Sequence, residues 1–138
     1  MFAIKKTFEV AISHSLTLPY ESKCSSDHGH NLIITVYAAS SDDYVERNNG
    51  MVIDFTEVTR KVHDIIDHEC LNNIEGIGYE KPFEDPNIDV KLNPTAENIA
   101  RWICNQFNRC YRVDVQESSG NIATYIDNGR VPDDTVGE

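Results

Sequence analysis

The stretch FAIKKTFEVAISH, residues 2–14, alternates between two faces over its whole length. One of these faces carries the apolar side chains Phe2, Ile4, Phe8, Val10 and Ile12. Lys6 interrupts this face, and His14 extends it. A hydrophobic period of two residues is typical of a β-strand with one buried face. We therefore expect residues 2–14 to form a strand.

A second stretch, HGHNLIITVYA, residues 28–38, repeats the alternation after a polar loop. The face that carries His28 and His30 also carries Leu32, Ile34 and Val36. The chain ends in two shorter strands, expected at 111–117 and 122–126, with Gly120 in the turn between them. Short connections of this kind favour an antiparallel sheet.

Two helices are expected between the strand pairs. Residues 54–70 follow an Asp54 N-cap and carry Phe55, Val58, Val62 and Ile65 at helical spacing. A second helix follows Pro94, with Thr95 as its N-cap and a stripe of Ile99, Ile103 and Phe107. We expect loops at 40–50 and 76–94. The order ββααββ predicts an α+β domain, a four-stranded antiparallel sheet with two helices on one face.

Length and charge restrict the classes of function. A chain of 138 residues suits a single domain over 1–138, with 127–138 as a flexible tail. The net charge of −11 argues against nucleic acid or an anionic membrane as a partner. We expect no transmembrane helix and no signal peptide. The four cysteines lack CxxC spacing, which favours reduced thiols in a cytoplasmic protein.

His14, His28 and His30 fall in phase on faces that are otherwise apolar. Three converging imidazoles favour a metal site of the catalytic zinc type, in which a fourth position is left to water or substrate. The alternative is a set of separate polar residues near a loop. Cys24 is a fourth ligand, an inert small side chain or a reactive thiol, and spacing does not choose among these.

The Asp67–His68 pair and Glu117 also have two interpretations each. Asp67 and His68 form either a solvated helix end or a carboxylate–imidazole pair that moves protons. Glu117 is either exposed at a strand end or buried, where a carboxylate accepts paired N–H bonds from a 2-aminopyrimidinone edge.

Five motifs, in order HGHN, GMVIDF, DHECLN, NPTAEN and VQESSG, resemble those of the 6-pyruvoyl-tetrahydropterin synthase / 6-carboxy-tetrahydropterin synthase family. The resemblance runs from about Phe8 to Tyr125. It implies the T-fold (tunnelling fold), whose subunits join edge to edge into β-barrels. It also implies a homohexamer, a dimer of trimers, with active sites at subunit boundaries.

The resemblance assigns roles to individual residues. It implies Zn²⁺ ligands at His14, His28 and His30, and a catalytic cysteine at Cys24. The Asp–His pair of the family matches Asp67 and His68. The family's pterin-anchoring glutamate matches Glu117, and Thr95 and Glu97 lie near the pterin pocket. These assignments imply a zinc-dependent lyase acting on 7,8-dihydroneopterin triphosphate.

The family contains two activities at one site. Three residues separate Cys24 from His28, a short interval that favours the 6-carboxy activity of queuosine biosynthesis. The 6-pyruvoyl activity, a non-catalytic pterin- or zinc-binding T-fold module and a closed structural zinc domain are the alternatives. The acidic chain shows no clear basic site for a triphosphate. Lys5, Lys6, Lys23 and Arg47 are candidate ligands, from the same or a neighbouring subunit, and a less phosphorylated pterin substrate stays open.

Overall fold

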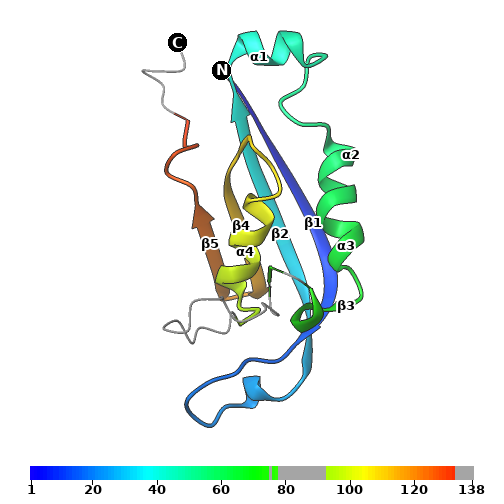
Figure 1. Ribbon diagram of the computed structural model, residues 1–138, viewed down its shortest axis with the longest axis vertical. Coiled ribbons are helices and arrows are strands. Elements are labelled where there is room, and N and C mark those ends of the chain that lie inside the picture. The colour runs from blue at the N-terminus through cyan, green and yellow to red at the C-terminus, as the bar shows by residue number, and fades with distance from the viewer. Residues whose placement is uncertain (75, 78–92, 133–138) are drawn as a thin grey trace, which may run out of the picture.

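The computed structural model describes residues 1–74, 76–77 and 93–132 of the chain. A single sheet forms its centre, with the strand order β3-β1-β2-β4-β5 (Figure 1). The strands are β1 (Phe2–His14), β2 (His28–Ser40), β3 (Glu69–Cys70), β4 (Cys110–Ser118) and β5 (Asn121–Ile126). β1 and β2 pair antiparallel over their whole length, from Phe2 opposite Ser40 to His14 opposite His28. The four strands expected from the sequence are therefore present.

The fifth strand, β3, was not expected. Its two residues pair in parallel with Ile12 and Ser13, on the outer edge of β1. All other strand pairs in the described residues are antiparallel. The pairing brings the chain that follows the first helical segment beside the end of β1, which is where His14 lies.

The first helical segment consists of α2 (Phe55–Val58), a π-helical turn η2 (Thr59–His63) and α3 (Asp64–Ile66). Asp54 caps it, as expected, by accepting a hydrogen bond from the Thr56 N–H at 2.9 Å. The segment ends at Ile66 rather than at Cys70, because Asp67 leaves the helical conformation and joins the sheet edge.

The π-helical turn changes which side chains face the core. Val58, Val62 and Ile66 are buried at four-residue intervals, whereas the expected Ile65 is 43% exposed. The Asp64 N–H bonds to the Thr59 carbonyl, five residues earlier, and this wider turn rotates the last residues of the segment. The expected stripe was therefore wrong at its two ends, because Phe55 is exposed too.

The second helix, α4 (Ala96–Cys104), begins as expected. Thr95 Oγ1 accepts a hydrogen bond from the Asn98 N–H at 3.2 Å, and Ile99, Ile103 and Phe107 are buried. α4 and the first helical segment lie on the same face of the sheet (Figure 1). The α+β prediction with helices on one face is confirmed.

A third, six-residue helix, α1 (Asp42–Arg47), replaces part of the loop expected at 40–50. Ser41 caps it by accepting a hydrogen bond from the Tyr44 N–H at 3.2 Å. Only Val45 of this helix is buried. One buried residue produces no helical period, so the pattern of the sequence did not reveal the helix.

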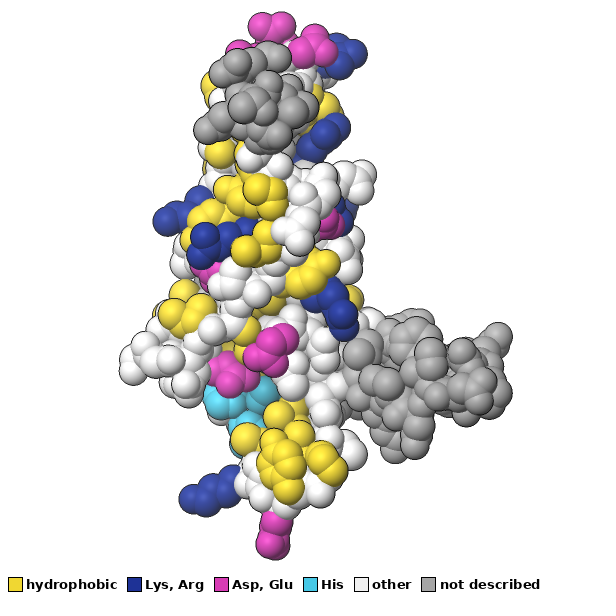
Figure 2. Space-filling view, turned by 90° about the vertical axis from the view of Figure 1, so that its left-hand side faces the viewer, with side chains coloured by type: hydrophobic (Ala, Val, Ile, Leu, Met, Phe, Trp, Pro, Cys, Tyr) yellow, Lys and Arg dark blue, Asp and Glu magenta, His cyan; other side chains and the backbone are white. Residues whose placement is uncertain are grey.

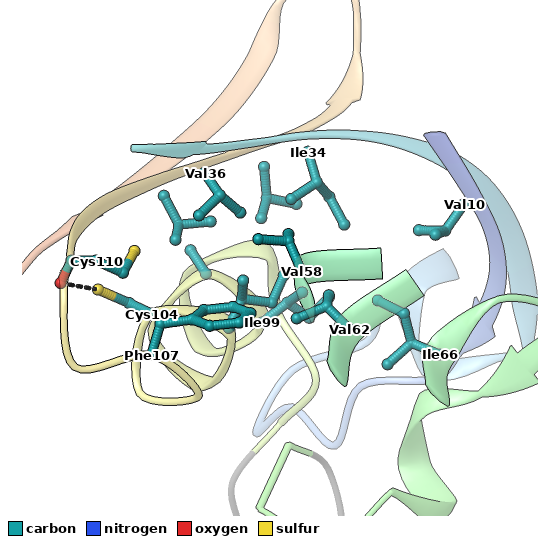
Figure 3. Packing of buried hydrophobic residues seen from close by; sticks show 14 of the residues in the cluster. Val10, Ile34, Val36, Val58, Val62, Ile66, Ile99, Cys104, Phe107 and Cys110 are labelled. Atoms are coloured by element: carbon teal, nitrogen blue, oxygen red, sulfur yellow. Dashed lines mark hydrogen bonds between the residues drawn. The ribbon is translucent and has the colours of Figure 1, made fainter. Parts of the chain in front are cut away.

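The core lies between the sheet and the helices. Figure 3 shows Val10, Ile34 and Val36 of the sheet facing Val58, Val62, Ile66 and Ile99 of the helices. Cys104 and Cys110 are buried beside them, and the Cys104 thiol donates to the Cys110 carbonyl at 3.5 Å. All four cysteines of the chain are free.

Part of the expected tail at 127–138 is attached to this core. Arg130 donates hydrogen bonds to the carbonyl oxygens of Cys104, Phe107 and Cys110. The rest of that expectation, at 133–138, and most of the expected loop at 76–94 lie outside the described residues. Among the described residues, no helix is long and apolar enough to cross a membrane.

Candidate functional site

The histidines that the sequence placed in phase come together at one end of the sheet. His14 and His28 are direct partners in the β1–β2 register, and His30 lies opposite Ile12. One nitrogen from each ring lies within 4.8 Å of the other two. The ring centroids are 4.6 to 5.0 Å apart. We call His14, His28 and His30 the histidine cluster.

Backbone carbonyl groups orient two of these rings. His14 Nδ1 donates to the Pro94 carbonyl at 2.7 Å, and His28 Nδ1 donates to the Ser26 carbonyl at 2.7 Å. A carbonyl oxygen only accepts, so each Nδ1 carries the hydrogen and each Nε2 keeps its lone pair. A hydrogen bond from the non-ligating nitrogen is the usual support of a metal-bound histidine.

The protonation of His14 also suits a metal ligand. Burial lowers the pKa of His14 most strongly, because the imidazolium loses its hydration. The Pro94 carbonyl and the charge of Glu117 raise this pKa, His28 and His30 lower it further, and the net pKa is below 6.5. His14 is therefore neutral near pH 7, the form that binds a metal ion. The cluster could hold one ion with three imidazole donors.

Cys24 lies on the loop between β1 and β2, in the short helical turn η1 (Lys23–Ser25). Ser22 caps this turn by accepting a hydrogen bond from the Cys24 N–H at 3.1 Å. The thiol is exposed, unlike an inert core cysteine. Within the described residues, the group that could hold an ion consists of the histidine cluster and does not include Cys24. The closed site with a thiolate ligand therefore has no support from the geometry.

Asp67 and His68 lie at the sheet edge beside β1. Asp67 Oδ1 accepts a hydrogen bond from the Ala11 N–H at 3.0 Å, and the His68 N–H donates to the Ala11 carbonyl at 2.6 Å. Asp67 Oδ2 lies 3.6 Å from His68 Nε2. The backbone of His68 has a positive φ of 61°, and its side chain is 81% exposed. A backbone N–H holds the carboxylate in place, and the imidazole is exposed.

His63 belongs to the same group, and the interpretation of the sequence missed it. Its Nε2 lies 3.7 Å from Asp67 Oδ2, and its Nδ1 lies 3.1 Å from Asp64 Oδ1. The ring packs edge-on against Phe8. The four-residue interval between His63 and Asp67 was the signal that could have found it.

Glu117 lies near the end of β4, on the face that carries Val113 and Val115. The register of β4 with β5 shifts between Gln116 and Ser118, so Glu117 is the extra residue of a β-bulge. It is half-buried, and its charge raises the pKa of His14. Figure 2 shows histidine side chains with acidic side chains beside them on one face of the molecule. The effect of its charge on His14 is the link between Glu117 and the histidine cluster.

Thr95 and Glu97 stand at the start of α4. Thr95 Oγ1 is occupied as the helix cap, and Glu97 is exposed in the first turn. The structure brings this turn to the cluster through the Pro94 carbonyl.

Among the candidate triphosphate ligands, Lys6 and Arg47 are engaged elsewhere. Lys6 Nζ donates to the Phe55 carbonyl and to Thr59 Oγ1, and Arg47 pairs with Asp43 on α1. Lys23 is the neighbour of Cys24 in η1.

The chain is similar in sequence to known proteins of one family. The sequence model of the 6-pyruvoyl tetrahydropterin synthase family matches residues 3–128. A 6-carboxy-5,6,7,8-tetrahydropterin synthase of Bacillus subtilis (strain 168) is 21% identical over 126 residues, 90% of this chain and 84% of that protein. A Pyrococcus abyssi protein, named provisionally as the same enzyme, is 31% identical over 111 residues, 70% of this chain and 68% of its own.

A solved structure supports the fold. The 6-pyruvoyl tetrahydropterin synthase of Caenorhabditis elegans superposes with a TM-score of 0.64 at 21% identity, over 92% of this chain and 96% of that one. The expected T-fold is confirmed by this superposition and by the family match. Since the match covers nearly the whole chain, the protein belongs to the 6-pyruvoyl tetrahydropterin synthase family.

Proposed function

We propose that this protein is a zinc-dependent 6-carboxy-5,6,7,8-tetrahydropterin synthase that acts on 7,8-dihydroneopterin triphosphate in queuosine biosynthesis. One observation carries the proposal. The histidine cluster keeps two Nε2 lone pairs available, and an exposed thiol, Cys24, stands on the turn that leads into His28. An exposed thiol on the loop that leads into a three-imidazole cluster, and outside the group that could hold an ion, suits acid–base catalysis.

Three imidazole donors with a fourth position left to water or substrate are the usual ligand set of catalytic zinc. When bound, it would supply a Lewis acid that acidifies the side-chain hydroxyl groups of the substrate. His14, His28 and His30 would hold it, with the Pro94 and Ser26 carbonyls keeping two of the rings in the ligating tautomer.

Each remaining residue has a part in the proposed reaction. Cys24 takes a proton from the substrate side chain, and His68, oriented by Asp67, transfers a proton on the opposite side. Glu117 accepts the two parallel N–H bonds of the pterin 2-amino group and N3. Thr95 and Glu97 flank the pterin from the first turn of α4.

The proposed bond changes follow from these roles. Loss of a hydroxyl proton drives cleavage of the adjoining carbon–carbon bond, and the two-carbon fragment leaves as acetaldehyde. Triphosphate leaves by elimination, and one water is taken up. The alternative 6-pyruvoyl reaction moves protons between neighbouring carbons and keeps the side chain whole. The three-residue interval between Cys24 and His28 and the names of the curated relatives favour cleavage.

The test is product analysis by mass spectrometry. Zinc-loaded protein is incubated with 7,8-dihydroneopterin triphosphate, and we expect 6-carboxy-tetrahydropterin and acetaldehyde in equal amounts. The 6-pyruvoyl product without acetaldehyde would establish the alternative activity. Tight binding without any product would establish a non-catalytic pterin-binding module.

We further propose that the protein is a cytoplasmic homohexamer, built as a dimer of trimers. In the described residues, β3 covers the outer edge of β1 only at Ile12 and Ser13, and β5 forms the opposite edge of the sheet. Open strand edges bind other strands, and edge-to-edge pairing of subunits satisfies both edges. His68, which projects from the β1 edge, would then face the neighbouring subunit. Sedimentation analysis should give six chains per particle.

A further inference from the structure

The segment Ser15–Thr17 connects the metal-ligand candidate His14 to the loop that carries Cys24. Two asparagine side chains bind it in the same manner. Asn72 Oδ1 accepts from the Ser15 N–H at 2.9 Å, and Asn72 Nδ2 donates to the Ser15 carbonyl at 2.9 Å. Asn93 repeats this pair at Thr17, with 2.7 Å to the N–H and 2.9 Å to the carbonyl. Each amide therefore satisfies both backbone groups of one residue.

The residue between them bonds in another direction. The Leu16 N–H donates to the Cys24 carbonyl at 2.8 Å. Ser15–Thr17 is thus bound to the two asparagines through its outer residues and to the backbone of Cys24 through its middle residue. In a sheet, successive residues of a central strand bond alternately to the neighbouring strand on each side. The segment Ser15–Thr17 bonds alternately in the same way, but the side-chain amides of the asparagines take the place of one neighbouring strand.

Each of the two asparagines is next to a residue that is buried or contacts the histidine cluster. Asn72 lies in the short helical turn η3 (Leu71–Asn73), next to the fully buried Leu71. Asn93 directly precedes Pro94, whose carbonyl accepts the hydrogen bond from His14 Nδ1. The dipeptide 93–94 therefore contacts both a metal-ligand candidate and the segment that holds Cys24.

The other end of the Cys24 turn leads to the histidine cluster as well. The turn closes with the Ser26 N–H bonded to the Lys23 carbonyl, and the Ser26 carbonyl accepts the hydrogen bond from His28 Nδ1. Cys24 is exposed on a loop, yet its backbone is linked to His14 on one side and to His28 on the other.

We propose that Asn72 and Asn93 are positioning residues that set the place of the Cys24 thiol relative to the histidine cluster. The proposal rests on the proposed function, in which Cys24 is the catalytic base. A loop of this length has many conformations, and a base displaced by about 1 Å loses up to about 100-fold in rate. The paired amide bonds select one conformation of the segment from which Cys24 is held.

The experiment compares Asn72→Ala, Asn93→Ala and the double variant with the unchanged protein. Asn48→Ala is the matched control, because Asn48 Nδ2 also binds one loop carbonyl, that of Met51 at 2.8 Å, but at the opposite end of the β1–β2 pair. Four quantities are measured: kcat and KM, zinc per chain, the melting temperature, and the pH profile of Cys24 alkylation, located by peptide mass.

We expect kcat to fall about 10- to 100-fold in each single variant, with KM and zinc content close to those of the unchanged protein. The alkylation profile of Cys24 should change in these variants and stay the same in Asn48→Ala. Asn93→Asp keeps the acceptor for the Thr17 N–H and loses the donor, so it should recover part of the lost rate.

Two results would overturn the positioning role. Unchanged kcat together with an unchanged Cys24 alkylation profile would show that the amide bonds do not place the thiol. A loss of zinc and of melting temperature that accounts for the whole loss of activity would show a structural role only. Alkylation of Cys24 can be measured without turnover. If Cys24→Ala retained activity, the proposed role of Cys24 as the base would fail, but the alkylation profile would still test whether Asn72 and Asn93 position the thiol.

Discussion

His14 Nδ1 donates a hydrogen bond to the carbonyl oxygen of Pro94 at 2.7 Å, across 80 residues of sequence. This contact joins the last residue of β1 to the residue before the cap of α4. It sets which ring nitrogen of His14 keeps its lone pair, and it brings the first turn of α4 to the histidine cluster. The site therefore depends on the docking of α4 as well as on the two long strands.

The first prediction concerns the metal. The protein should bind about one zinc ion per chain, and His28→Ala should remove both the zinc and the activity, because two imidazoles hold an ion much less tightly than three. Metal analysis by mass spectrometry measures the content. His63→Ala is the control for zinc content alone, since His63 lies outside the cluster but pairs with Asp67, whose carboxylate has a proposed part in turnover. Full zinc content in a variant with alanine at 14, 28 and 30 would contradict the site.

Cys24→Ala separates the base from the ligands. We expect it to keep zinc and the fold, because the thiol is exposed and lies outside the group that could hold an ion. Turnover should fall by about 10² to 10⁴, the usual contribution of a general base. Steady-state kinetics and metal analysis of the same sample measure the turnover and the zinc content of the variant. Loss of zinc in parallel with turnover would instead make Cys24 a ligand.

Asp67 has two separable tasks, a hydrogen bond to the Ala11 N–H and a charge beside His68. Asp67→Asn keeps an acceptor for Ala11 and removes the charge, so activity should fall while stability stays close to that of the unchanged protein. Asp67→Ala also loses the hydrogen bond and should cost about 1 kcal/mol of unfolding free energy in addition. Urea unfolding and kinetics measure the two effects. Equal activity of Asp67→Asn and the unchanged protein would contradict the role of the pair.

The π-helical turn predicts different costs for two adjacent isoleucines. Ile66 is fully buried, so Ile66→Ala should lower the unfolding free energy by about 2–5 kcal/mol. Ile65 is 43% exposed, so Ile65→Ala should cost less than about 1 kcal/mol. Urea unfolding of the two variants gives the comparison. The reverse order would mean that the helix continues without the wider turn.

Acid should destabilise the protein through Asp114. Burial raises the pKa of Asp114, but hydrogen bonds from Arg112, Thr124 and Tyr37 outweigh it, so the net pKa lies below the ordinary 3.8. A lowered native pKa means that the group stabilises the fold above the unfolded pKa. This stabilisation is lost as the pH falls through the native value.

Asp114→Asn should therefore narrow the difference in unfolding free energy between pH 7 and pH 3. Urea titrations at the two pH values measure this difference. A pH dependence that is the same in both proteins would exclude Asp114 as its source.

The sequence by itself determined the two long strands and the phase of the three histidines. The period of two in 2–14 and 28–38 is a local property, because each side chain takes its face from its own strand. That phase favoured a shared site for His14, His28 and His30 but left separate polar residues as the alternative, and the register of β1 with β2 brings the three together. Thr95 was recognisable as a cap from its position before an apolar stripe.

Only the tertiary structure decided the features that depend on residues far apart in the chain. Strand β3, the position of Asp67 beside Ala11, and the amide bonds of Asn72 and Asn93 join residues 56 to 76 positions apart. The π-helical turn and the bulge at Glu117 each add one residue to a regular repeat. The local hydrophobic period does not predict such contacts. The two residues of each contact come together only when the rest of the chain has folded.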